Sequence, residues 1–426
     1  NRAMQKGIKT RLIIYEILKE LKNTSLSYDN LLSNKLKTLN ISQPDKNMIH
    51  NVVLSSMRYH LHVLEMLKLF VKKRITEKQF ILLLGAITQI IYLNFKEYAV
   101  VHSTVEIAKK KSISIFPGFV NAILKKIILN KIKLQKIQIK FNQLPDWFCS
   151  RTNNWDINKK KLFLENIIKT PELHIVFKNN YLMQKFNIKH HITSARSLAI
   201  KNSTLIKKLP NYERGDWWVQ DFATMLPIYL IDQIKDKMVL DMCGAPGGKS
   251  FQMISSSGKT TIIDISHKRS QILKTNLKRL NYKNTIKIID ALKIDTKTEY
   301  DYVLVDAPCS AVGTIRRNPE IFYRNNEPNF SDITKLQQKL LEKSTKLIKK
   351  NGIVIYMVCS FLEEETTKQI DFFLKRNKNF KLENFFSNDG DIKKLIDKNG
   401  FINTTPLKTN NTYHDGFFAA KLKYYV

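Results

Sequence analysis

The chain has 426 residues, 43% of them hydrophobic, which is enough for two or three domains with cores of their own. It carries 71 Lys and Arg against 37 Asp and Glu, a formal net charge of +34. This excess indicates a polyanionic partner such as nucleic acid, although drift toward lysine in an A+T-rich genome would also raise the charge. The longest apolar run, from Phe80 to Ile87, is too short to cross a bilayer, so no membrane partner is expected.

The four cysteines argue against a metal site. Cys149, Cys243, Cys309 and Cys359 lie far apart in the sequence, and none has a histidine at zinc-ligand spacing. We therefore expect no bound metal, and reduced thiols rather than a disulfide framework. The N-terminal residues do not resemble a signal peptide, which predicts a cytoplasmic protein. No pattern indicates an obligate oligomer, and a monomer is expected.

Residues 1–135 are expected to form an all-α bundle. Apolar residues recur at helical spacing from Ile14 to Leu21, as on the buried face of a helix. Further helices are predicted at about 46–71, 77–93, 99–110 and 117–130. Lysines gather toward the end of the bundle, beginning with Lys109, and contacts to phosphate groups need only such a feature.

Residues 136–210 predict a small α+β connector, with a strand at His174–Phe177, and residues 211–426 predict an α/β domain. In that domain strands are predicted at 238–242, 260–263, 285–289, 302–305 and 352–357. Helices are predicted after residue 248 and at about 267–280 and 332–350. This alternation is typical of a doubly wound sheet.

The stretch Val239–Ser250 predicts a buried strand, a glycine-rich turn and a helix, which suits a nucleotide-like cofactor. Its end, Gly248-Lys249-Ser250, is similar to a phosphate-binding P-loop. However, the P-loop motif needs Gly where this chain has Cys243, and the dinucleotide spacing G-x-G-x-x-G is missing. The turn alone leaves the ligand open.

Four successive predicted strands end on an acid: Asp241, Asp264, Asp290 and Asp306. Ligands of such sheets bind outside the carboxyl ends of the strands. An acid after the second strand is well placed for ribose hydroxyls, and one after the third can accept from an exocyclic amine. The pattern favours S-adenosylmethionine over ATP or NAD.

Two cysteines follow the carboxyl ends of predicted strands, Cys309 in the segment after Asp306 and Cys359 after the strand at 352–357. Buried cysteines are usually inert, but two at neighbouring strand ends indicate a shared pocket. A thiolate is the group needed to attack an electron-poor ring carbon. The basic residues Lys249, Arg316 and Arg317 are expected to lower the pKa of these thiols.

Several segments resemble the signatures of the Nop/Sun family of RNA cytosine-C5 methyltransferases. They are Asp241–Lys249, Asp306–Ile321, Cys359–Glu365 and Tyr413–Lys421. Residues 101–108 and 119–124 resemble the NusB-type domain found in bacterial members that act on 16S rRNA of the small ribosomal subunit. The resemblance implies a Rossmann-like class I S-adenosylmethionine-dependent methyltransferase domain, preceded by a NusB-like RNA-binding bundle and the small connector.

By this resemblance, Cys359 attacks C6 of the target cytosine and Cys309 assists release of the product. Asp306 would hold the edge of the cytosine ring, and Lys249 would support the same pocket. Residues 243–249 would hold the methionine end of the cofactor, Asp264 its ribose and Asp290 its adenine. The implied cofactor contacts are Cys243, Gly244, Ala245, Pro246, Gly247, Gly248, Lys249, Asp264, Asp290 and Asp306.

The chain departs from the family pattern at a few positions. Gly244 stands where Ala is usual, and Val358, Glu363 and Thr366 differ around the second cysteine. Alternatives to methylation of 16S rRNA are the same chemistry on tRNA or on another rRNA site, and a non-catalytic RNA-binding factor of ribosome assembly. A P-loop ATPase is disfavoured by Cys243.

Overall fold

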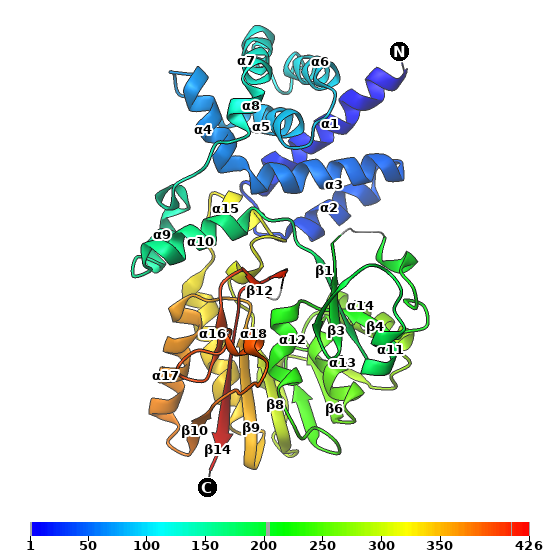
Figure 1. Ribbon diagram of the computed structural model, residues 1–426, viewed down its shortest axis with the longest axis vertical. Coiled ribbons are helices and arrows are strands. Elements are labelled where there is room, and N and C mark those ends of the chain that lie inside the picture. Colours follow the sequence, from blue (N-terminus) through cyan, green and yellow to red (C-terminus); the bar gives the residue numbers. More distant parts are fainter. Residues whose placement is uncertain (1, 202–204, 410, 426) are drawn as a thin grey trace. The chain divides into compact units, whose positions relative to one another are not determined.

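The computed structural model describes residues 2–201, 205–409 and 411–425, which form two compact units (Figure 1). The helical unit contains the residues up to Ile168 together with Ile315–Glu327. The sheet unit contains Lys169–Thr314 and the chain from Pro328 onward. The three-part division expected at residues 135 and 210 stays a prediction.

The helical unit is built from short and medium helices. Their bounds are α1 Arg2–Leu21, α2 Tyr28–Lys37, α3 Gln43–Arg58, α4 His60–Phe70, α5 Glu77–Ile91, α6 Glu97–Ala108, α7 Pro117–Leu129, α8 Lys131–Leu134, α9 Asp146–Arg151, α10 Ile157–Ile167 and α15 Glu320–Tyr323, with a 3₁₀ turn at Phe141–Gln143. The single helix expected over 46–71 is two helices, because the backbone leaves the helical region at Tyr59. Helix α2 was not expected, since only Tyr28 and Leu31 of it are buried.

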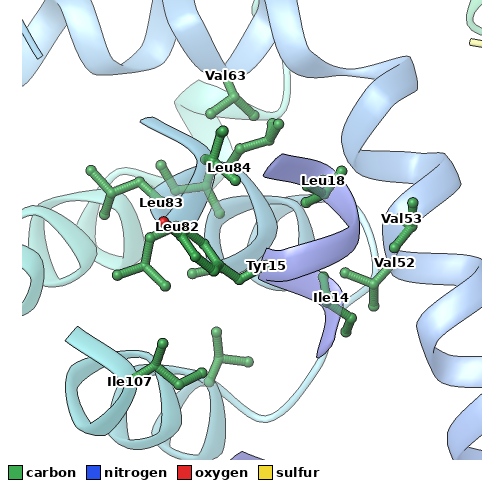
Figure 2. Close-up of a cluster of buried hydrophobic side chains, with 14 of the residues drawn as sticks. Ile14, Tyr15, Leu18, Val52, Val53, Val63, Leu82, Leu83, Leu84 and Ile107 are labelled. Carbon is green, nitrogen blue, oxygen red and sulfur yellow. The ribbon is translucent and has the colours of Figure 1, made fainter. Parts of the chain in front are cut away.

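The core of the helical unit surrounds α5. This helix is buried without a break from Ile81 to Ile91, as its apolar sequence predicts for a central helix. It begins with a capping box in which the Thr76 and Gln79 side chains each bond the other's backbone N–H. Figure 2 shows side chains from α1, α3, α4 and α6, among them Val63 and Ile107, gathered around Leu82, Leu83 and Leu84.

The segment Ile315–Glu327 belongs to the helical unit although it comes from far along the sequence. Tyr323 is 1% exposed, and its hydroxyl donates to the carbonyl of Leu18 at 2.7 Å. Lys22 Nζ donates to the Tyr323 carbonyl at 2.9 Å, and the backbone N–H of Tyr28 donates to Glu320. The core of the helical unit is therefore completed by residues that follow Cys309 closely in the chain.

The sheet unit contains a large mixed sheet in the order β10-β14-β9-β8-β5-β6-β7, with β11 also paired to β14. The strands are β5 Met238–Asp241, β6 Lys259–Asp264, β7 Ile286–Ile288, β8 Tyr300–Asp306, β9 Ile348–Val358, β10 Phe380–Glu383, β11 Ile402–Thr404 and β14 Phe417–Tyr424. Strands β5 to β9 pair in parallel, whereas β14 runs antiparallel to β9. The expected α/β sheet is confirmed, with an antiparallel edge in addition.

Helices cover both faces of this sheet. They are α12 Phe222–Tyr229, α13 Gly248–Ser255, α14 His267–Arg279, α16 Phe330–Ser344, α17 Thr367–Arg376 and α18 Gly390–Lys393. Val239 of β5 packs in one hydrophobic cluster with side chains of α12, α13 and α14. Its neighbour Leu240 packs in a second cluster with side chains of α16 and α17. Successive residues of a strand point to opposite faces, so the two clusters are the two layers of a doubly wound fold.

A smaller antiparallel sheet in the order β2-β3-β1-β4 precedes the large one. Its elements are β1 Leu173–Phe177, α11 Asn180–Gln184, β2 His191–Ser194, β3 Ser197–Ile200 and β4 Trp217–Val219. The strand expected at His174–Phe177 is β1. A further pair, β12 Leu407–Thr409 and β13 Thr412–His414, lies near the C-terminus. Among the described residues, no helix is both long and apolar enough to cross a membrane.

Because Tyr323 is buried in the helical core, Tyr323→Ala should lower the free energy of unfolding of the helical unit by about 3–5 kcal/mol, as for other buried aromatic residues. Urea unfolding followed by circular dichroism measures this loss. The matched control is Tyr98→Ala, since Tyr98 lies in the same unit but is 75% exposed. Equal effects of the two substitutions would show that the downstream segment does not support the helical core.

Candidate active site

The end of β5 is fastened to the start of α13 by a buried carboxylate. Asp241 is 1% exposed and accepts hydrogen bonds from the Ser250 hydroxyl at 2.7 Å and from the backbone N–H of Cys243 at 3.4 Å. Burial raises the pKa of Asp241 to about 6, with a further contribution from the charge of Asp306. Asp241 therefore shapes the glycine turn rather than facing a ligand.

The glycine turn passes so close to its neighbours that side chains would not fit. Gly247 has φ +117°, and a Cβ there would lie 2.4 Å from the Phe251 ring and 2.5 Å from Leu273. A Cβ on Gly244 would lie 2.4 Å from Cγ2 of Ile262 on β6. Ile262 thus explains why this chain has Gly at 244, where the family resemblance led us to expect Ala.

Two strand-end acids follow β6 and β7. Asp264 is 1% exposed and accepts from the backbone N–H groups of Ala245 and Ser266 and from the Arg269 guanidinium. A carboxylate has about four acceptor positions, so one remains for a ligand hydroxyl. Asp290 is half-buried and accepts from the backbone N–H of Leu292. Both lie at the carboxyl edge of the parallel strands, as the sequence predicts.

The acid that ends β8 forms an ion pair with the lysine of the glycine turn. Lys249 Nζ lies 2.8 Å from Oδ2 of Asp306, and the exposed fractions of the two side chains are 10% and 26%. Burial lowers the pKa of Lys249, but the nearby Asp306 and Cys359 outweigh it, and the net shift is upward. Lys249 is therefore a charged ammonium, and its partner Asp306 pairs with Met357, two residues before Cys359.

The two cysteine loops follow neighbouring parallel strands, β8 and β9, in which Asp306 pairs with Met357. The backbone N–H of Gly313 donates to the carbonyl of Cys359 at 3.0 Å, and that of Gly416 donates to Gly313 at 2.8 Å. A Cβ on Gly313 would lie 2.1 Å from the Gly416 carbonyl. The Cys359 loop is thus held by backbone segments that only glycine allows to approach so closely.

The pKa of Cys309 lies well above its usual range. Burial is the largest cause, followed by the negative charges of Glu365 and Cys359. The expectation that basic residues lower the thiol pKa is wrong for Cys309, because desolvation dominates there. Arg316 and Arg317 belong to the helical unit, where the carbonyl of Arg316 accepts from Arg58.

A buried carboxylate that no local sequence pattern indicates joins the two cysteine loops. Glu365 is fully buried and accepts from Ser310 N–H at 2.7 Å, from Ser310 Oγ at 2.6 Å and from Ser360 Oγ. In the sequence it is the last residue of the run Glu363–Glu365, which is typical of a solvated surface. Only its place within a segment that resembles the family signature could have drawn attention to it.

The geometry fits the cofactor inferred from the sequence. The glycine turn brings backbone close to the carboxyl edge of the sheet without side chains in the way, and two acids with acceptor positions follow the next two strands. These carboxylate acceptors suit the hydroxyls of a ribose and the amine of an adenine, and they do not suit a triphosphate. Among the described residues, no group of three or more His, Cys, Asp or Glu side chains could hold a metal ion.

A doubly wound sheet with a glycine turn after its first parallel strand and acids after the next two defines an S-adenosylmethionine-dependent methyltransferase fold. Residues 228–423 match the family model of 16S rRNA methyltransferase RsmB/F, and residues 8–129 match the NusB family model. The chain therefore combines a domain similar to the RsmB/F rRNA methyltransferases with an N-terminal domain similar to the NusB family.

Curated relatives are similar over most of the chain, and solved structures share its fold. Ribosomal RNA small subunit methyltransferase B of Photorhabdus laumondii is 28% identical over 405 residues, 90% of this chain and 91% of the relative. The Yersinia pestis protein of the same name is 25% identical, over 79% of this chain and 84% of its own length. The crystal structure of PH0851 matches with a TM-score of 0.71 at 20% identity, over 98% of both chains. NSun6 from Pyrococcus horikoshii, with SFG, matches with a TM-score of 0.53 at 17% identity, over 65% of this chain and 96% of its own.

The raised pKa of Asp241 gives a testable pH dependence. Unfolded, this carboxyl titrates near its usual 3.8, whereas in the folded protein it titrates near 6. Between these values the folded state binds more protons than the unfolded state does. The contribution of Asp241 to the free energy of unfolding therefore falls as pH rises from about 4 to 6 and is constant above that. The total fall is about 3 kcal/mol. The variant Asp241→Asn lacks this titration. In urea unfolding, its free energy of unfolding should therefore rise relative to that of the wild type as pH increases from about 4 to 6. A difference that does not change with pH would contradict the assignment.

Proposed function

We propose that the protein methylates C5 of a specific cytosine in 16S rRNA through a temporary covalent bond between Cys359 and C6 of the base. The observation that carries the proposal is the pair of cysteine loops at the carboxyl ends of β8 and β9, beside the Lys249–Asp306 ion pair. The match of residues 228–423 to the RsmB/F model supports rRNA as the substrate. The choice of C5 of cytosine rests on the two thiols.

Covalent catalysis is needed because C5 of a pyrimidine is a poor nucleophile. Attack of the Cys359 thiolate on C6 forms an S–C6 bond and moves the electron pair of the C5–C6 double bond to C5. When bound, S-adenosylmethionine would supply the methyl group for that carbon and would leave as S-adenosylhomocysteine, whose sulfur keeps the electron pair of the broken S–CH₃ bond. Removal of the C5 proton then restores the double bond and expels Cys359 as a thiolate.

The electrostatics of the site support different roles for the two cysteines. Lys249 is paired with Asp306, which lies opposite Met357, two residues before Cys359, and a neighbouring ammonium stabilises a thiolate. Cys309 has a raised pKa and keeps its proton at neutral pH. We therefore assign Cys359 as the nucleophile. We propose that Cys309 assists removal of the C5 proton through a water molecule that accepts this proton, because a thiol that keeps its own proton cannot accept another.

The remaining site residues hold the base and the cofactor. We propose that Asp306 accepts from the edge of the cytosine ring and that Lys249 holds Asp306 in place through their 2.8 Å ion pair. Residues 243–249 would contact the methionine end of S-adenosylmethionine, while Asp264 binds its ribose and Asp290 its adenine. The target base has to leave its stack to reach the thiols.

We further propose that the helical unit binds RNA through a basic groove between α4 and α5. The groove has a volume of about 580 Å³ and combines an apolar floor, including Leu61, Leu64 and Phe80, with a basic rim. The rim residues Lys72, Lys73 and Arg74 are exposed. Phosphates suit such a rim and an unstacked base suits such a floor, which favours a single-stranded segment of rRNA as the occupant.

Cys359→Ala should abolish methyl transfer, whereas Cys309→Ala should accumulate a covalent enzyme–RNA species, because attack proceeds but release does not. Transfer from labelled S-adenosylmethionine to rRNA measures the first effect, and a shifted band on a denaturing gel detects the second. Cys149→Ala is the matched control, since Cys149 lies in the helical unit. Near-normal turnover by Cys359→Ala would overturn the assignment of the nucleophile.

A separate experiment locates the target cytosine. Bisulfite sequencing of rRNA from a strain that lacks the protein should show the loss of one modified cytosine.

Loss of the basic rim should weaken binding of RNA without slowing chemistry at saturation. The triple variant Lys72→Gln/Lys73→Gln/Arg74→Gln should reduce the slope of log affinity against log salt by about 2 for single-stranded RNA. The control is Lys393→Gln/Lys394→Gln/Lys398→Gln, which removes the same charge from exposed positions of the sheet unit. Equal losses of affinity in filter binding would mean that net charge, and not the groove, binds RNA.

A further inference from the structure

The loops that carry Cys309 and Cys359 share one buried anchor. The residue after each cysteine, Ser310 and Ser360, donates its side-chain hydroxyl to Oε2 of Glu365. The backbone N–H of Ser310 donates to the other oxygen, Oε1, at 2.7 Å. A single carboxylate therefore bonds both loops at the position next to each thiol.

A second side chain strengthens the anchor on the Cys309 side. Gln337 of α16 is fully buried, and its Nε2 donates to Glu365 at 3.3 Å and to the carbonyl of Pro308 at 3.1 Å. Cys309 is thus held through the residue before it and the residue after it. Glu365 is itself fixed, because the Tyr356 hydroxyl on β9 donates to its backbone carbonyl at 2.6 Å.

The hydrogen bonds around Glu365 suit an ionised carboxylate. Its oxygens receive four donors, two from Ser310 and one each from Ser360 and Gln337. A carboxylate can only accept, so the donors satisfy it without water. Hydrogen bonds to an ionised acceptor are shorter and stronger than neutral ones, and this anchor is consequently stiffer than direct contact between the two serines would be.

We propose that Glu365 is a positioning residue that fixes Cys309 and Cys359 relative to each other, so that both thiols reach one base. The inference rests on the proposed function, in which Cys359 forms a bond to C6 and Cys309 assists removal of the proton from the adjacent C5. Groups that act on neighbouring ring atoms tolerate little displacement. The negative charge of Glu365 also adds to burial in keeping the proton on Cys309.

The first test measures the thiols without any reaction on RNA. Dibromobimane bridges two thiols that lie close together, and peptide mapping identifies the Cys309–Cys359 product. The wild type should give this product, and Glu365→Gln should give it about tenfold more slowly, because an amide offers a donor where the serine hydroxyls need an acceptor. The control is Glu342→Gln, which removes the same charge from α16 at a residue with a 38% exposed side chain.

The second test measures catalysis on folded protein. Glu365→Gln should lower kcat by about 100-fold with little change in KM for RNA or S-adenosylmethionine, as expected for misplaced reacting groups. Glu365→Asp keeps the charge but is too short to span both loops, so it should not rescue kcat. If Glu365→Gln does not fold, Ser310→Ala and Ser360→Ala each remove one side-chain donor and leave the carboxylate otherwise satisfied. Ser360→Ala should slow formation of the adduct, and Ser310→Ala should slow its breakdown.

The two tests separate the inference from the proposed function. A folded Glu365→Gln variant that is bridged by dibromobimane and turns over like the wild type would overturn the positioning role. If bridging is lost while Cys359→Ala retains activity, Glu365 positions the thiols but the proposed covalent function is wrong. Loss of bridging together with loss of kcat supports both.

Discussion

The register between β8 and β9 is the constraint on which the candidate site depends. These strands run parallel with Asp306 opposite Met357, so the loops after them begin side by side at the same edge of the sheet. Cys309 and Cys359 lie three and two residues beyond that pair. Parallel pairing alone gives only approximate proximity, because each loop could turn away. The hydrogen bonds to Glu365 and the close approach of Gly313 to Gly416 supply the remaining constraint.

The carboxyl edge of the sheet holds acids and thiols in different electrostatic environments. Asp241 is buried and has a raised pKa, whereas Asp306 nearby is paired with Lys249. The residue after Cys309 bonds Glu365, whereas Cys359 follows the strand that lies opposite Asp306, the partner of Lys249. A pair of chemically identical thiols is therefore placed in unlike environments. Such a difference suits a reaction in which one cysteine attacks as a thiolate while the other stays protonated and assists a later step.

Much of the fold and part of the site follow from the sequence. Strand-end acids and the glycine turn are local patterns, so the order of residues along the chain is enough to place Asp264, Asp290 and Asp306 at one edge of the sheet. The effects of burial on individual side chains could not be predicted from such local patterns. The expected pKa shift of Cys309 had the wrong sign, since sequence shows the charged neighbours but not the desolvation that outweighs them. Glu365 was missed because a run of three glutamates gives no indication that one of them is buried.

Contacts between segments that are distant in the sequence could not be predicted either. Tyr323 follows Cys309 closely and would be expected to serve the sheet unit, yet its hydroxyl bonds Leu18 in the helical core. The family resemblance identified the segment just before it, Asp306–Ile321, without indicating where that segment packs. Similarly, the need for Gly at position 244 depends on Ile262 of the neighbouring strand, a contact that no local pattern contains.

The central claim is that Cys359 forms a bond to C6 of a cytosine. An rRNA fragment with 5-fluorocytosine at the target position tests it directly, because fluorine at C5 cannot leave as a proton does and the adduct cannot resolve. With S-adenosylmethionine present, mass spectrometry of the digested complex should find the nucleotide attached to Cys359. Attachment to Cys309, or methyl transfer with no adduct on either cysteine, would contradict the account.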